Sequence, residues 1–342
     1  MNRFLVNIII CIMIASAPSV CLASGETLKK VRSKGVLHCG VSEGLTGFSI
    51  KDASGRWTGL DADFCRAVAA AVFGNPEKVV FVALAPSERF PALQSGGIDL
   101  LSRNTTWTIG REAGLGVRFV GALFYDGQGF MVRQAKKLPA ISDLKGVTIC
   151  VEKGTTSQDN LADHFRARNL KYQPLVFDSL EETKKAFVSG KCKAYTSDRS
   201  QLAAIRSELP GGSKTYAILP GKISKEPLGP AVRQKDEAWF TLVRWVLFAL
   251  IEAEEQGITR ENVLVKAKEK GKPRQERFLG LSGNYGKMLG VNNDWVVRVV
   301  ESVGNYGEMF DRNLGKGSLL NLERGPNSLW SQGGLMYAPP FR

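Results

Sequence analysis

The sequence predicts an α/β protein of two lobes, each a mixed and mostly parallel sheet flanked by helices. Three observations support this prediction: apolar strand-like runs alternate with amphipathic helix-like runs, the alternation occurs twice, and about 320 residues remain after a predicted leader. A chain of that length exceeds a comfortable single core, so two lobes are expected.

Residues 1–23 have the pattern of a secretory signal peptide. Arg3 precedes an apolar core from residue 4 to residue 15, and cleavage is expected near Ala23. The apolar core is short for a membrane span, and an uncleaved anchor is the alternative. The bulky Val20 just before Cys21 argues against lipid attachment at that cysteine. The mature chain is therefore expected to be exported and soluble.

The first α/β unit follows the leader. Strands are expected at residues 36–41, 79–84 and 98–101. A helix at residues 61–73 lies between the first two strands, and a helix capped by Ser87 and ending near residue 96 lies between the last two. This βαβαβ order indicates a mostly parallel sheet with helices on both faces.

The same pattern then restarts. Strands are expected at residues 147–151, 172–177 and 194–196. A helix at residues 155–166 lies between the first two strands. A second helix, with Ser179 and Glu182 as a capping box, runs to residue 190 before the third. The last strand delivers Asp198.

Two extended, glycine-containing segments are expected to cross between the lobes. They lie at residues 124–132 and 226–232, and their glycines can absorb a rotation. Helices expected at residues 237–256, 259–270 and 293–304 would pack back on the first lobe. The predicted boundaries are therefore 24–126 for the first part of lobe I, 127–228 for lobe II, and 229–342 for the return to lobe I with a C-terminal helical extension.

Four cysteines remain after the leader: Cys39, Cys65, Cys150 and Cys192. An even number in an oxidising compartment predicts two disulfides. The pairing Cys39–Cys65 with Cys150–Cys192 is preferred among three possibilities, because each bond then stays within one half of the chain. A zinc site is the alternative, but there is no Cys-x-x-Cys pair and the chain has only two histidines. No metal site is predicted.

The strong positive charge does not indicate nucleic acid. The formal charge of +13 becomes +12 when Arg3 leaves, and the densest basic runs, at residues 29–34 and 266–274, alternate with apolar or acidic positions. These runs are typical of solvated helix faces, and export also argues against a nucleic-acid partner. No phosphate-binding Gly-x-x-x-x-Gly-Lys motif is present, so the chain is not an ATPase. His38 and His164 form no convincing nucleophile–base pair.

Residues 99–111 carry the clearest binding chemistry. A short apolar run ends in hydroxyls and an amide, and Arg111 follows. This set suits a carboxylate, because a guanidinium grips both oxygens and hydroxyl donors fill the remaining lone pairs. A second donor cluster, Gly154-Thr155-Thr156, opens a helix, and Asp198 follows a later strand. One cation and one anion with their donors can together hold a zwitterion.

These segments resemble the amino-acid-binding branch of the bacterial extracellular solute-binding proteins, family 3, over the whole mature chain. The sequences GLDADFCR at 59–66, SRNTTWT at 102–108, SKEPLGPAV at 224–232 and YAPPFR at 337–342 are most similar to general L-amino acid receptors of ABC importers. The resemblance implies the type II periplasmic-binding-protein fold, in which two lobes form a hinged clamp.

The resemblance also implies roles for single residues. Arg111 would clamp the ligand α-carboxylate, with Thr106 and Asn104 beside it, and Asp198 would pair with the α-ammonium. Thr155 and Thr156 would act at a helix N-terminus, which favours an anion. An ordinary surface arginine and a helix N-cap are the alternatives for Arg111 and Asp198. The sequon that starts at Asn104 could mark glycosylation, but in a cleft it would rather supply donors.

One departure from the family pattern concerns the apolar wall of the pocket. Leu45 replaces the aromatic that many relatives place there, while Phe48 and Trp107 stay nearby as candidate ligand contacts. Plain core packing is the alternative for both aromatics. A smooth apolar wall without a charge for the ligand side chain would accept many amino acids, so broad specificity is expected.

The implied function is the periplasmic binding component of an ABC importer. It would bind L-amino acids as a monomer, without cofactor or catalysis, and deliver them to an inner-membrane permease. Two alternatives remain: an amino-acid sensor linked to a chemoreceptor, and a periplasmic enzyme on the same clamp, which would need a general acid or base in the cleft.

Overall fold

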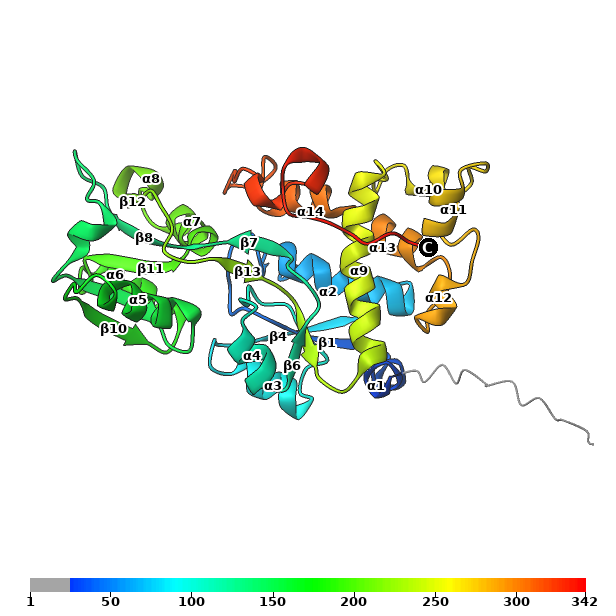
Figure 1. Cartoon of the computed structure of the whole chain (residues 1–342), viewed down its shortest axis with the longest axis horizontal. Coiled ribbons are helices and arrows are strands. Elements are labelled where there is room, and N and C mark those ends of the chain that lie inside the picture. Colours follow the sequence, from blue (N-terminus) through cyan, green and yellow to red (C-terminus); the bar gives the residue numbers. More distant parts are fainter. Residues whose placement is uncertain (1–24) are drawn as a thin grey trace, which may run out of the picture.

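A computed structural model describes residues 25–342, and the predicted signal peptide lies outside the described residues. Two five-stranded sheets, each covered by helices, form two lobes that are joined by a pair of neighbouring extended strands (Figure 1). The α/β class and the two-lobed arrangement agree with the sequence prediction.

The sheet of lobe I has the strand order β4-β1-β5-β14-β6. These strands are Val79–Ala83, Leu37–Val41, Leu100–Leu101, Ala231–Arg233 and Val117–Phe119. The first three are parallel, whereas β14 is antiparallel to both of its neighbours. The three expected strands therefore pair in parallel, and the antiparallel strand comes from much later in the chain.

The sheet of lobe II repeats this layout with the order β10-β9-β11-β8-β12. These strands are Gln173–Phe177, Thr148–Glu152, Ala194–Asp198, Gln128–Arg133 and Tyr216–Ile218. The first three are again parallel, and β8 is antiparallel to β11 and β12. Its β11 ends on Asp198 at the edge that faces lobe I.

The connection between the lobes is a two-stranded antiparallel sheet of β7 (Phe124–Asp126) and β13 (Glu226–Leu228). The chain continues from β7 into β8 of lobe II, and from β13 into β14 of lobe I. Each crossing thus supplies the antiparallel strand of one sheet. This pair of strands is called the hinge below.

Except for the helix after β11, for which no range was predicted, the helices that flank the sheets begin and end close to the predicted positions. They are α2 (Leu60–Phe73), α3 (Arg89–Ser95), α5 (Thr156–Arg166), α6 (Leu180–Val188), α7 (Arg199–Glu208) and α9 (Glu237–Glu255). The side chains of Thr155 and Ser179 accept hydrogen bonds from main-chain N–H groups three residues on, and so cap α5 and α6. These caps satisfy helix N–H groups that have no partner within the helix.

Two helix predictions are wrong in detail. Ser87 does not cap α3: the helix begins at Arg89, and the Glu88 carboxylate instead turns back to accept a hydrogen bond from the N–H of Ala85. The helix predicted at residues 259–270 is reduced to α10 (Val263–Lys266). Thr259 and Asn262 exchange side-chain to main-chain hydrogen bonds in a turn before it.

The remaining elements are short. They comprise α1 (Glu26–Lys34), α4 (Ile109–Gly114), α8 (Gly212–Thr215), α11 (Pro273–Phe278), α12 (Tyr285–Met288), α13 (Trp295–Val303), α14 (Tyr306–Asn313), η1 (Ile141–Leu144), η2 (Gly325–Asn327), η3 (Trp330–Gln332), β2 (Ile50–Lys51) and β3 (Trp57–Thr58). Among residues 25–342 no helix combines the length and apolar character needed to cross a bilayer.

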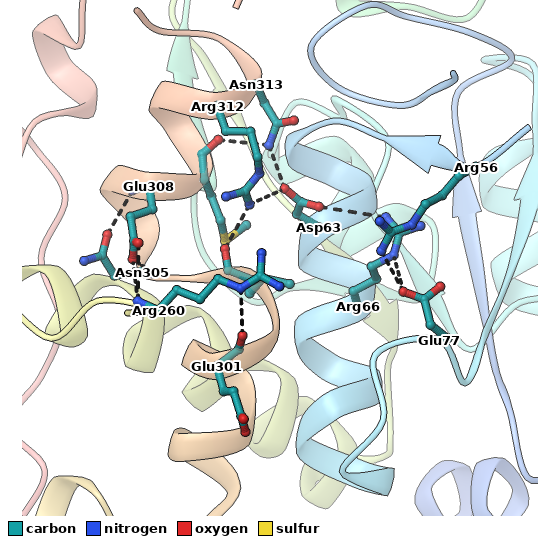
Figure 2. Close-up of polar contacts among 12 residues, drawn as sticks. Arg56, Asp63, Arg66, Glu77, Arg260, Glu301, Asn305, Glu308, Arg312 and Asn313 are labelled. Atoms are coloured by element: carbon teal, nitrogen blue, oxygen red, sulfur yellow. Dashed lines mark hydrogen bonds and ion pairs between the residues drawn. The ribbon is translucent and has the colours of Figure 1, made fainter. Parts of the chain in front are cut away.

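The C-terminal helices pack on lobe I, as expected. α13 lies against α2 and α9, and its valines are buried with Trp239 of α9. Asp63 of α2 accepts hydrogen bonds of 2.6 Å from Arg312 and 2.7 Å from Asn313, both of α14 (Figure 2). A buried carboxylate with these partners ties the end of α14 to the first α/β unit.

Both disulfides of the preferred pairing are present. Cys39–Cys65 joins β1 to α2 in lobe I, and Cys150–Cys192 joins β9 to the turn before β11 in lobe II. Each bond therefore closes a loop within one lobe and leaves the hinge free.

Candidate ligand-binding site

Polar residues of the two lobes meet on one face. Thr106 Oγ1 lies 3.2 Å from Thr156 Oγ1, and Asn104 Nδ2 donates to Gln201 Oε1 over 3.1 Å. Arg89 Nη2 donates to the carbonyl of Gly154 over 3.2 Å. The loop after β5 on lobe I thus faces the starts of α5 and α7 on lobe II.

The loop after β5 is held in shape by a buried carboxylate. Asp61 accepts hydrogen bonds of 2.8 Å from Ser102 Oγ and from the N–H of Asn104. Asn104 has a φ of 28°, in the left-handed region that non-glycine residues seldom adopt. Burial raises the pKa of Asp61 to about 6. Asp61 is therefore a positioning residue for Asn104.

Three arginines bring positive charge to the lobe I side. Arg111 Nη1 donates to the carbonyl of Thr106 over 2.8 Å, and Arg103 Nε donates to the carbonyl of Leu84 over 2.8 Å. The guanidinium carbons of Arg89 and Arg111 lie 5.1 and 5.4 Å from the centre of the Phe90 ring. Burial lowers the pKa of all three, and Arg111 adds to the effect on Arg89.

Carboxylates gather on lobe II and at the hinge. Glu152, Asp198 and Glu226 are buried, and Asp126 is partly buried. Glu152 accepts hydrogen bonds from Tyr195 and Gln201, whereas Glu226 accepts from Thr156 over 2.9 Å and from Asn160 over 2.7 Å. Burial and the nearby Asp126 and Glu226 raise the pKa of Asp198 well above its usual range.

The buried atoms without partners indicate what this site can bind. Asp198 Oδ1 and Asn104 Oδ1 are acceptors with no donor, and Arg89 Nε is a donor with no acceptor. Buried polar groups of this kind are rarely left unsatisfied. An ammonium supplies donors to the oxygens and a carboxylate supplies acceptors to the guanidiniums, so the site is complementary to a ligand that carries both charges.

The structure brings most of the predicted site residues to this face. Asn104, Thr106 and Thr156 form the contacts between the lobes, and the positions of Arg111 and Asp198 add the opposite charges. Thr155 lies behind Thr156: its hydroxyl donates to the carbonyl of Glu152 over 2.7 Å and accepts from Gln158 as the cap of α5.

The two predicted aromatic contacts pack against side chains of lobe I. Phe48 is 1% exposed and packs edge-on against Phe124 in the core of lobe I. The Trp107 indole N–H donates to Glu112 over 2.7 Å, and its ring stacks on Phe119. Core packing, the alternative from the sequence, describes Phe48, whereas Trp107 is only partly buried and stays a predicted ligand contact. Leu45 is also buried there.

Several residues of the site were not found from the sequence: Arg89, Glu152, Gln201, Glu226 and Asp61. Glu226 and Asp61 lie inside the recognised motifs at 224–232 and 59–66, which was the available signal. Arg89, Glu152 and Gln201 come from an ordinary helix start, a strand end and a helix interior, and nothing local sets them apart. In residues 25–342 no group of three or more His, Cys, Asp or Glu side chains could hold a metal ion.

Comparisons with known proteins agree with this geometry. Residues 37–261 match the family described as bacterial extracellular solute-binding proteins, family 3. The chain is 52% identical to the general L-amino acid-binding periplasmic protein AapJ of Rhizobium johnstonii, and the match covers 94% of each chain. It is 48% identical to the glutamate/glutamine/aspartate/asparagine-binding protein BztA of Rhodobacter capsulatus, again over 94% of each chain.

A solved structure matches nearly the whole molecule. This ABC transporter periplasmic binding protein from Brucella ovis, with glutathione bound, superposes with a TM-score of 0.90 at 48% identity. The match covers 92% of the present chain and 99% of the Brucella chain.

Proposed function

This chain belongs to the bacterial extracellular solute-binding proteins, family 3, and from that membership we propose that it captures free L-amino acids for an ABC importer. The two close relatives are named as amino-acid-binding proteins, and the site has opposite charges on opposite lobes. The unpartnered Asp198 oxygen, buried opposite three arginines, is the observation that carries this proposal.

The head group of the amino acid would span the two lobes. Arg111 takes the α-carboxylate, with the Thr106 hydroxyl as a further donor, and Thr156 adds the N-terminus of α5 from lobe II. Asp198 takes the α-ammonium, which offsets the burial and the carboxylate repulsion that raise its pKa. Asn104 Oδ1 is a second acceptor for the same ammonium.

Arg89 would bind a second carboxylate on the ligand. It is 3% exposed, and its hydrogen bonds go to a carbonyl and, over 3.4 Å, to the Thr105 hydroxyl. A buried guanidinium without a carboxylate is costly, so an acidic ligand side chain would be favoured there. The relative BztA is named for glutamate and aspartate as well as for glutamine and asparagine, and glutathione, which is bound in the Brucella structure, has two carboxylates.

The ligand would close the clamp and present a surface to a membrane permease. Residues 24–126 and 229–342 would move as lobe I and residues 127–228 as lobe II. The protein would act as a monomer in the periplasm after cleavage near Ala23, and would release each ligand chemically unchanged. A ligand drives this closure only through contacts that the open form lacks.

Calorimetry against a panel of L-amino acids tests the proposed function. Arg111→Ala should weaken every ligand by at least ~2 kcal/mol, about 30-fold, because a carboxylate would lie in the cleft without its cation. Arg56→Ala, an exposed arginine of the same lobe, is the matched control and should bind as the wild type does. Failure of the wild type to bind any amino acid would refute the proposal.

A second titration isolates the role of Arg89. Arg89→Gln keeps a hydrogen-bond donor but removes the charge. The affinity for glutamate and for glutathione should therefore fall about 10-fold more than the affinity for glutamine. Equal loss for glutamate and glutamine would mean that Arg89 shares the α-carboxylate, and would refute the second-carboxylate assignment.

A further inference from the structure

The segment beyond the family match contacts three successive residues where one crossing begins: the residue before β7 and the first two residues of β7. This segment, residues 262–342, is called the C-terminal extension. Its Tyr306 donates a hydrogen bond of 2.9 Å to the carbonyl of Leu123, and its Phe310 stacks on Phe124 at a centroid distance of 6.2 Å. Its Asn327 is bonded to Tyr125.

Asn327 acts in place of a neighbouring strand. Its Oδ1 accepts from the N–H of Tyr125 over 2.6 Å, and its Nδ2 donates to the carbonyl of Tyr125 over 3.1 Å. Asn327 is 2% exposed. Both main-chain groups of Tyr125 that point away from β13 are therefore satisfied by one side chain, which closes an edge of the hinge.

The other edge of the hinge holds the ligand-binding loop. Pro227 of β13 pairs with Tyr125, and its carbonyl accepts a hydrogen bond of 2.8 Å from the N–H of Trp107. Thr106 forms a bridge with Leu228. The order across the hinge is thus ligand loop, β13, β7 and Asn327, all joined by hydrogen bonds.

Asn327 is itself held firmly to lobe I. Arg324 donates to the carbonyl of Asn327 over 2.9 Å and to Glu254 of α9 over 3.1 Å. The Arg324 guanidinium also lies over the rings of Tyr306 and Phe310, 5.2 and 4.9 Å from their centres. The three contacts with Leu123 and β7 therefore belong to one connected unit, seen beside β7 in Figure 1 as α14 and the terminal segment.

Toward lobe II the extension does not pack tightly. A cavity of about 280 Å³ separates Leu322–Asn327 from Arg199, Ala203 and Lys222 of lobe II. The extension thus restrains the lobe I end of the hinge and leaves lobe II room to move.

We propose that the C-terminal extension is a strap that fixes β7 and, through β13, holds the ligand loop in the arrangement that meets lobe II. Asn327 is its main positioning residue. The proposal rests on the proposed function, since it concerns closure around the ligand. It predicts that a loosened strap favours the open form and lowers the affinity for every ligand by the same factor.

The test measures lobe separation and affinity in the same variants. Dyes on Ser54→Cys in lobe I and Ser189→Cys in lobe II report separation by single-molecule energy transfer, because the four cysteines of residues 25–342 are disulfide-bonded. Asn327→Ala should shift the ligand-free molecules toward longer separations and weaken every bound amino acid about 5-fold to 10-fold. Tyr306→Phe should act in the same direction but less, and exposed Ser331→Ala should change neither reading.

The two readings separate the possible failures. Unchanged lobe separations in both Asn327→Ala and Tyr306→Phe would refute the strap proposal. A loss of affinity confined to one ligand would refute it as well. If the wild type bound no amino acid, the proposed function would fall, while the ligand-free separations would still decide on the strap. If Asn327→Ala does not fold, Tyr306→Phe decides alone, because it removes only a hydroxyl.

Discussion

Single residues in the site have surroundings that make sense only with a ligand. Asp198 is buried among other carboxylates, with one oxygen unpaired and a pKa raised well above its usual range by burial and by Asp126 and Glu226. An ammonium in contact would favour its ionised form. The residue is thus suited to hold a cation of the ligand.

Asp198→Asn should therefore weaken glutamate by about 2 kcal/mol or more, and glutarate, which lacks the amine, much less. The affinity of the wild type should also fall as the pH is lowered, because ammonium binding requires ionised Asp198, and the variant should lose this dependence. Calorimetry of both ligands at several pH values measures the effect. Equal losses for glutamate and glutarate would contradict the ammonium assignment.

Asp61 gives a prediction for stability. Its pKa in the folded state is about 6, above its ordinary 3.8, so between these values the unfolded chain loses the proton first. The contribution of Asp61 to the free energy of unfolding is then greatest at low pH and falls by about 2 kcal/mol as the pH rises from 4 to 6.

Asp61→Asn should remove this pH dependence. In urea denaturation, the free energy of unfolding of the variant should therefore rise relative to that of the wild type between pH 4 and pH 6. Asp178→Asn, a surface carboxylate of lobe II, is the control and should follow the wild type. If the difference in unfolding free energy between Asp61→Asn and the wild type stays constant from pH 4 to pH 7, Asp61 is not the source of the pH dependence.

At the scale of elements, two helices of lobe II start with the same kind of cap but differ in position. Thr155 caps α5 and Ser179 caps α6, each through a hydroxyl that accepts from a main-chain N–H. Only α5 begins at the face where Thr106 meets Thr156. The two caps therefore form a natural pair for separating stability from binding.

Thr155→Ala and Ser179→Ala should each cost about 1 kcal/mol of unfolding free energy, since each leaves a helix N–H without its partner. Only Thr155→Ala should also weaken amino-acid binding, because it loosens the N-terminus that carries Thr156. Denaturant unfolding and calorimetry of the two variants check this. A binding loss of the same size in Ser179→Ala would point to a general effect on lobe II.

At the scale of the whole molecule, two similar sheets are joined by one pair of strands. Each disulfide lies within one lobe, so neither restrains their relative movement. The lobes meet through few polar contacts, and the ligand would add charged contacts between them. The open and closed forms should therefore differ mainly by rotation at the hinge.

Small-angle scattering should then show a smaller radius of gyration on addition of a bound amino acid. Arg111→Ala at the same ligand concentration should remain extended, because it lacks the main carboxylate contact. An unchanged radius in the wild type with saturating ligand would exclude closure as the mechanism.

Much of the fold follows from local patterns in the sequence. The alternation of apolar residues predicted the strands and main helices of both lobes, since a strand and a helix each impose a period that neighbouring residues must satisfy. Where a prediction was wrong, as at Ser87 and at residues 259–270, side chains of nearby polar residues offered the main chain other partners.

The sequence by itself determined the two α/β units, the disulfide pairing, and the segments that carry Arg111, Thr156 and Asp198. Only the tertiary structure decided that Arg89, Glu152 and Glu226 join them, that Phe48 and Trp107 pack within lobe I, and that Asn327 bonds to the outer edge of β7. The physical reason is distance along the chain: a local period fixes which face a residue occupies. Which faces meet depends on how whole elements pack, and no short stretch of sequence contains that information.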